Sequence, residues 1–142
     1  MAPDEARRQQ LIHDAMVLSP DDVQDVAAQL WQGLALQLIV LIGENGFNSL
    51  YTRSLYLAKE SFPWLPQGDT SRSFDFQFTD LKLSLASQST TEADTASRAL
   101  LQIFTNSLAS LIGEPLILTI LISAWADNSS GRETADKEFR HE

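Results

Sequence analysis

The chain has 142 residues, and its 10 basic against 19 acidic side chains give a formal charge of −9 at pH 7. This length suits one domain with a real core, and the negative charge opposes non-specific binding to nucleic acid or to an anionic membrane surface. The lack of cysteine excludes a disulfide framework, a thiolate nucleophile and a zinc finger, and it fits a cytoplasmic protein. From the negative charge we expect no binding to nucleic acid.

The first predicted element is a surface helix over residues 4–18. It has a moderate apolar stripe on one face, formed by Leu11, Ala15 and Leu18. Arg7 and Arg8 fall outside this stripe, and we assign no role to His13. The opening residues lack the apolar core of a signal peptide, and no apolar stretch reaches the ~20 residues of a membrane span. We therefore expect no membrane insertion.

An internal repeat organises the chain from residue 19 onward. Residues 19–44 align with residues 89–114 at an offset of 70, with eight identities in 26 positions. Both copies end in Leu-Ile-Gly-Glu, at 41–44 and at 111–114. Because the start and stop signals also coincide, the match indicates two equivalent structural units. We predict two long equivalent helices over residues 19–43 and 89–113.

The ends of these two helices carry defined signals. Ser19 and Ser89 each place a hydroxyl at the helix cap with an acidic residue three positions later, which satisfies free amides of the first turn. Gly43 and Gly113 stand where a helix ends in a left-handed residue, a conformation that glycine adopts without penalty. Between these ends, apolar residues recur every three or four positions, as in an amphipathic helix.

A third helix is predicted over residues 48–62, ended by the Phe-Pro-Trp-Leu-Pro segment. The next segment is ambiguous, because the residues Phe74, Phe76, Phe78, Leu81, Leu83 and Leu85 alternate as in a β-hairpin. Phe74, Phe78, Leu81 and Leu85 also share one helical face. The segment aligns with the first helix in the repeat, and an isolated hairpin is marginally stable. We therefore predict a helix over residues 75–87, with the hairpin as the alternative.

The last predicted helix covers residues 114–126 and is apolar on nearly every side. Residues 127–142 are polar and are predicted to form a mobile tail. The predicted fold is an all-α, six-helix, bundle-like single domain over residues 1–126. It consists of two pseudo-equivalent three-helix halves, at about 5–62 and 75–126.

Two glutamates are candidates for a metal site. Glu44 and Glu114 occupy equivalent positions of the repeat, and a pseudo-twofold arrangement would bring two carboxylates to similar helix junctions. A structural role is favoured, because each glutamate lies just before a helix and complements its positive end. Di-iron bundles also use a Glu-x-x-His motif that this sequence lacks. We expect no cofactor and no catalytic residue.

Two arginines are candidates for an anion-binding site. Arg53 and Arg98 lie in mostly apolar helical surroundings, where structural pairing with Glu44, Glu114 or Glu92 is the commoner arrangement. Aromatic residues, Tyr51 and Trp125 among them, are candidates for a ligand pocket between helices, although such residues more often belong to the core.

The leading functional hypothesis is a non-enzymatic interaction or regulatory module that binds itself or another protein. No phosphate-binding loop is present, and the two histidines are poorly placed for a serine triad. Surplus apolar helix surface predicts a homodimer whose contact includes Tyr56, Ile117 or Leu121. The alternative is a helical-bundle sensor of an apolar or anionic small molecule, and a carboxylate metal protein comes third.

Overall fold

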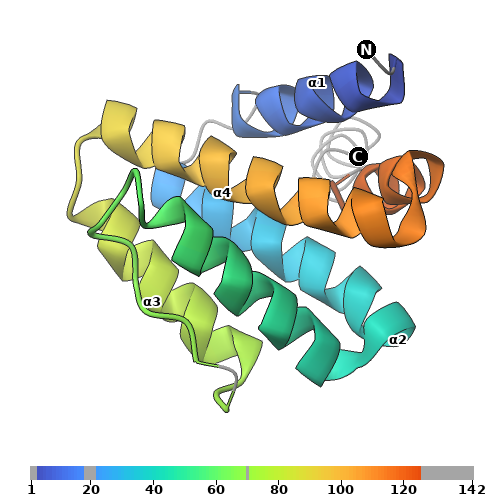
Figure 1. Cartoon of the computed structure of the whole chain (residues 1–142). Helices are drawn as coiled ribbons and strands as arrows, with labels where there is room; N and C mark the ends of the chain where they lie inside the picture. Colours follow the sequence, from blue (N-terminus) through green and yellow to red (C-terminus); the bar gives the residue numbers. More distant parts are fainter. Residues whose placement is uncertain (1–2, 18–21, 70, 126–142) are drawn as a thin grey trace, which may run out of the picture.

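The computed structural model describes residues 3–17, 22–69 and 71–125, and every element in these ranges is a helix (Figure 1). The labelled elements are α1 (Pro3–Val17), α2 (Val23–Ala58), α3 (Phe74–Ala86) and α4 (Thr90–Ile112). A C-terminal helix, Glu114–Trp125, follows α4. The predicted all-α class is therefore confirmed. Ser19 and the predicted tail at 127–142 lie outside the described residues. The predicted helix start at residue 19 is wrong, because α2 begins at Val23 with the extended residue Asp22 as its N-cap.

The predicted count of six helices is not confirmed, because the second and third predicted helices form one element. This element, α2, contains a single non-helical residue, Gly43, at which its axis bends. The start of α4 agrees with the prediction, since the Ser89 hydroxyl accepts a hydrogen bond from the Glu92 amide at 3.1 Å. The C-terminal helix also begins where the sequence indicates, directly after Gly113.

Gly43 and Gly113 are the two positive-φ residues of the described chain. Gly43 has φ 79° and ψ 163°, and Gly113 has φ 93° and ψ 149°. The positive φ was predicted, but ψ is extended, whereas a left-handed helical residue has ψ of about +47°. In this region of backbone space only glycine is comfortable. The chain therefore changes direction at each glycine, and Figure 1 shows both turns at the same end of the molecule.

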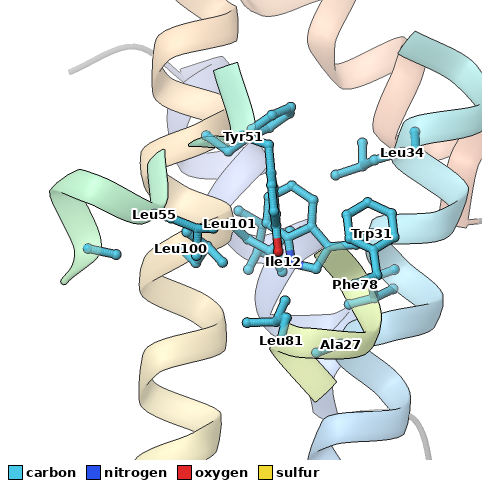
Figure 2. Packing of buried hydrophobic residues seen from close by; sticks show 14 of the residues in the cluster. Ile12, Ala27, Trp31, Leu34, Tyr51, Leu55, Phe78, Leu81, Leu100 and Leu101 are labelled. Carbon is cyan, nitrogen blue, oxygen red and sulfur yellow. The ribbon is translucent and has the colours of Figure 1, made fainter. Parts of the chain in front are cut away.

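The core lies where the two copies of the repeat meet α3. Equivalent positions of the repeat are buried together: Leu30 with Leu100, Leu34 with Phe104, and Leu38 with Leu108. At the centre, the Trp31 ring meets the Tyr51 ring edge-on at 5.0 Å and the Phe104 ring at 4.9 Å. Figure 2 shows Trp31 and Tyr51 side by side among leucines from α2, α3 and α4. Edge-to-face contacts of this kind add stability beyond the buried area.

The ambiguous segment is a helix, α3, as predicted. Phe78, Leu81 and Leu85 are buried on the face that packs against α2, whereas Phe76 and Leu83 are exposed. The Phe76 ring instead lies under the Arg72 guanidinium, at 5.3 Å. The alternation that resembles a hairpin therefore comes from apolar residues on opposite sides of one helix.

Of the helices in the described ranges, α2 alone is long and apolar enough to cross a bilayer by length and composition. The core helix of a soluble protein meets the same criterion. In its most apolar 18-residue window, 39% of residues are buried within the fold. The helix also bends at Gly43 and packs against α1, α3 and α4. Before the bend, Leu36, Val40 and Leu41 are exposed in the described structure.

Replacing Gly43 or Gly113 with alanine should lower the free energy of unfolding by about 1 kcal/mol or more, because a side chain is strained at positive φ. The cost comes from the backbone, since a Cβ at Gly43 meets no atom within 4 Å and one at Gly113 meets only Pro115 Cδ at 3.8 Å. Chemical denaturation measures the change. Ser110→Ala, on the exposed surface of α4, is the control and should be neutral. Unchanged stability in both glycine variants would contradict the assigned turns.

Candidate functional site

An ion pair between the buried Arg8 and the partly exposed Glu114 joins α1 to the start of the C-terminal helix. Arg8 is 1% exposed, and its Nε and Nη2 atoms donate to the two carboxylate oxygens of Glu114 at 3.0 and 2.9 Å. Its Nη1 atom donates to Thr105 Oγ1 at 3.0 Å. This bidentate geometry is the strongest arrangement available to a guanidinium and a carboxylate. The charge of Arg8 is thus balanced inside the fold, and α1 is held against α4.

The pairing of Glu114 removes the proposed metal role for Glu44 and Glu114. Glu114 is occupied by Arg8, whereas Glu44 is exposed. Within the described ranges, no group of three or more His, Asp or Glu side chains is placed to hold a metal ion. The two equivalent glutamates therefore have different surroundings, and Glu114 has a structural role, which the sequence favoured over a shared metal site.

Glu114→Gln should lower the free energy of unfolding by about 2–3 kcal/mol, because it leaves the buried guanidinium without its countercharge. Glu44→Gln is the matched control, since Glu44 has the same place in the repeat but is exposed. That variant should change stability by less than about 0.5 kcal/mol. Both values come from urea denaturation. Equal effects of the two substitutions would show that Glu114 stabilises the fold through helix-end electrostatics and not through its pairing with Arg8.

Tyr51 and Trp125, predicted to line a ligand pocket, are core residues. The Trp125 Nε1 atom donates to the Leu30 carbonyl at 3.2 Å. Tyr51 is fully buried, and its hydroxyl has no hydrogen-bond partner in the described structure. Burial, with a smaller contribution from the Asp80 charge, raises the pKa of the Tyr51 phenol above its ordinary value. The phenol therefore stays neutral in the fold. Both residues belong to the core, which is the arrangement that the sequence favoured over a ligand pocket.

Tyr51→Phe should raise the free energy of unfolding by about 1 kcal/mol, because it removes a buried hydroxyl that makes no hydrogen bond. It should also reduce the loss of stability at alkaline pH. The unfolded phenol ionises above its pKa of about 10, whereas the folded phenol stays neutral because its pKa is raised. The stability of the parent chain is therefore unaffected by this group below pH 10 and falls as pH rises above it. Denaturation at pH 8 to 11 tests both effects, and Tyr56→Phe is the exposed control. A destabilised Tyr51→Phe variant would show that the hydroxyl has a partner.

The two arginines predicted as anion ligands have different surroundings. Arg98 pairs with Asp94 one helical turn away, at 3.0 Å, and also contacts His13 on α1. It makes none of the predicted pairs with Glu44, Glu114 or Glu92. Arg53 is exposed, and it lines a cleft of about 620 Å³. The cleft is lined by Ser49, Thr52, Arg53, Tyr56, Lys59, Glu60, Gln67 and Gly68.

The predicted interface residues differ in their exposure to solvent. Ile117 and Leu121 are fully buried within the chain, so they have no surface to offer a partner. Their burial in the hydrophobic core corrects that expectation. Tyr56 is 70% exposed. Of the ten large apolar side chains that are exposed in the described ranges, six belong to α2 before Gly43, the end of α4 and the C-terminal helix. These six are Leu36, Val40, Leu41, Leu111, Leu116 and Ile122.

Sequence reasoning missed Arg8, which it placed on the wet side of the first helix. The buried face of α1 carries Arg8, Ile12 and Met16, which follow one another at four-residue spacing. A signal for Arg8 was present, because Glu114 is the single charge between Arg98 and Asp127. A lone carboxylate in such an apolar stretch needs a buried partner of opposite charge.

No protein-family model, curated protein or solved structure matches the chain. The physical arrangement of its own residues therefore carries the functional argument.

Proposed function

We propose that the chain is a non-enzymatic interaction or regulatory module that associates with a second copy of itself. Its two halves, at about 5–62 and 75–126, are proposed to be pseudo-equivalent three-helix units, with α2 counted as two helices on either side of Gly43. The proposed contact surface is the apolar end, defined as the six exposed residues Leu36, Val40, Leu41, Leu111, Leu116 and Ile122.

The observation that carries the proposal is the exposure of the leucine in both Leu-Ile-Gly-Glu motifs. Leu41 is 56% exposed and its equivalent Leu111 is 72% exposed, while neighbouring Val40 is 84% exposed. The turns explain why glycine stands at positions 43 and 113 of the two motifs. No contact within the described chain explains why leucine stands at positions 41 and 111. Large apolar patches are uncommon on the surface of a monomer and usually mark an interface.

The distribution of charge favours a second copy as the partner. Residues 26–43, 99–113 and 115–126 contain no Asp, Glu, Lys or Arg, although the whole chain has a charge of −9. Two copies repel each other over most of their surface, but the apolar end presents little like charge. A twofold dimer through this end buries it and keeps the acidic surfaces apart.

Leu41→Glu and Leu111→Glu should each weaken self-association, because a charge would be buried at the contact. Light scattering at micromolar concentration should give about twice the 15.8 kDa monomer mass for the parent chain and a lower mass for each variant. Leu83→Glu is the matched control, since Leu83 is an equally exposed leucine on α3. That variant should remain dimeric.

A parent chain that stays at 15.8 kDa would refute self-association and leave only docking of another protein. Equal effects of Leu83→Glu and Leu111→Glu would refute the assignment of the contact to the apolar end. Far-UV circular dichroism of each variant separates a lost contact from a lost fold.

A further inference from the structure

Most arginines and lysines in the described ranges are in ion pairs, but a few are not. Seven arginines and lysines lie in these ranges: Arg7, Arg8, Arg53, Lys59, Arg72, Lys82 and Arg98. Four are in ion pairs, with Glu114, Asp80, Asp25 and Asp94 as partners. Of the three that have no carboxylate partner among the described residues, Arg53 and Lys59 line the same cleft. In a chain with a charge of −9, such a pair stands out as available for an external anion.

An exposed aromatic ring lies between these two cations in sequence. Arg53, Tyr56 and Lys59 are three residues apart, at the end of α2, and all three line the cleft. Successive members are therefore separated by about 4.5 Å along the helix axis. The Tyr56 ring is 70% exposed, and it is not part of the aromatic core. The Tyr56 ring therefore offers a flat surface for stacking, with the Arg53 charge on one side along the helix and the Lys59 charge on the other.

The wall of the cleft opposite α2 is held in place. Gly68 lies so close to Thr52 that a Cβ at Gly68 would be 2.8 Å from Thr52 Cα. The next residue, Asp69, donates its amide to Gln77 Oε1 at 3.2 Å, and Gln77 Nε2 donates to Asn48 Oδ1 at 3.3 Å. Gln77 and Asn48 are both buried. The cleft is therefore preformed, which lowers the entropic cost of binding.

A buried polar atom adjoins the cleft. The Thr52 Oγ1 atom is inaccessible and has no hydrogen-bond partner among the described residues. Unpartnered buried hydroxyls are uncommon in folded proteins and call for an explanation, such as a bound water or ligand. Lys59 contacts only a neutral group in this region, since its Nζ atom donates to Gln67 Oε1 at 3.4 Å. Arg53 and Lys59 thus line the cleft without an ion-pair partner among the described residues, although the Glu60 carboxylate also belongs to the lining.

We propose that this cleft binds a small planar organic anion, in which a ring bears a carboxylate or a phosphate group. The ring stacks on Tyr56, and the anionic group pairs with the Arg53 guanidinium, with Lys59 contributing the second charge. A guanidinium matches both carboxylate and phosphate oxygens in a two-point contact. This binding site is separate from the proposed self-association, because none of the six residues of the apolar end lines the cleft.

Titration of the full chain with phenyl phosphate and with phthalate tests the proposal and distinguishes the two anionic groups. Amide chemical shifts should move at residues 49–60 and 67–68 for at least one probe, at concentrations up to about 10 mM. Benzamide, which is planar and neutral, and inorganic phosphate, which lacks a ring, should each bind at least tenfold more weakly. Shifts confined to other residues, or no shifts with either ringed anion, would overturn the proposal.

Arg53→Gln should weaken binding of the better probe by about tenfold or more, because one charge-assisted contact is lost. Arg7→Gln is the matched control, because Arg7 is also exposed and also without a described carboxylate partner, but lies on α1. It should leave affinity within about twofold. Equal losses in the two variants would indicate only a general charge effect and would overturn the site.

Tyr56→Leu tests the stacking contact while keeping both charges. It should weaken the ringed anions but leave the weak binding of inorganic phosphate unchanged. If Tyr56→Leu affects phosphate and phenyl phosphate equally, the ring does not stack on Tyr56 and the planar-anion assignment is wrong. Both substitutions are at exposed positions, so the fold should persist in each variant.

Discussion

The architecture depends on two backbone turns that only glycine accommodates. Gly43 and Gly113 have positive φ with extended ψ, and the chain changes direction at each of them (Figure 1). Without these turns, the apolar residues after each glycine could not return to the core around Trp31. Phe47 and Tyr51 follow Gly43, whereas Ile117 and Leu121 follow Gly113, and all four are fully buried. The core is thus assembled from residues on both sides of each turn.

The same four-residue motif is used differently in its two copies. After Gly113, the Glu114 carboxylate is bound by the buried Arg8 guanidinium, which fastens α1 to α4. After Gly43, the equivalent Glu44 is exposed. Arg8 comes from outside the repeated segment, so the repeat itself could not determine which glutamate would be paired. Common local sequence therefore sets the turn, and the tertiary environment sets the role of the charge that follows it.

Much of the fold could be predicted from periodicity and helix-end signals, because these depend on residues close together in sequence. The cap at Ser89, the glycine breaks and the helical face Phe78, Leu81 and Leu85 are of this kind. Long-range packing could not be predicted. Arg8 was placed in solvent, because its partner lies 106 residues away, and Tyr51 was offered as a ligand contact because burial against Trp31 is not visible in sequence. Of the candidate site, Arg53 was singled out from the sequence as an anion ligand and Tyr56 as an interface residue, while Lys59 and the Gly68 wall follow from the geometry.

The helix α2 contributes residues to both the apolar end and the cleft, on opposite sides of Gly43. Coupling between two such sites requires an element with two arrangements that both sites bias. The turn at Gly43 lies between the two sites and could be such an element, but the helical segments on its two sides are packed against each other. Trp31 before the turn packs edge-on against Tyr51 after it, and Phe47 and Tyr51 both contact Phe78 of α3. Moving the turn would separate these rings and open the core, which costs several kcal/mol for buried aromatic side chains. Occupation of the cleft and association through the apolar end should therefore be energetically independent, with α2 acting as a rigid support for both.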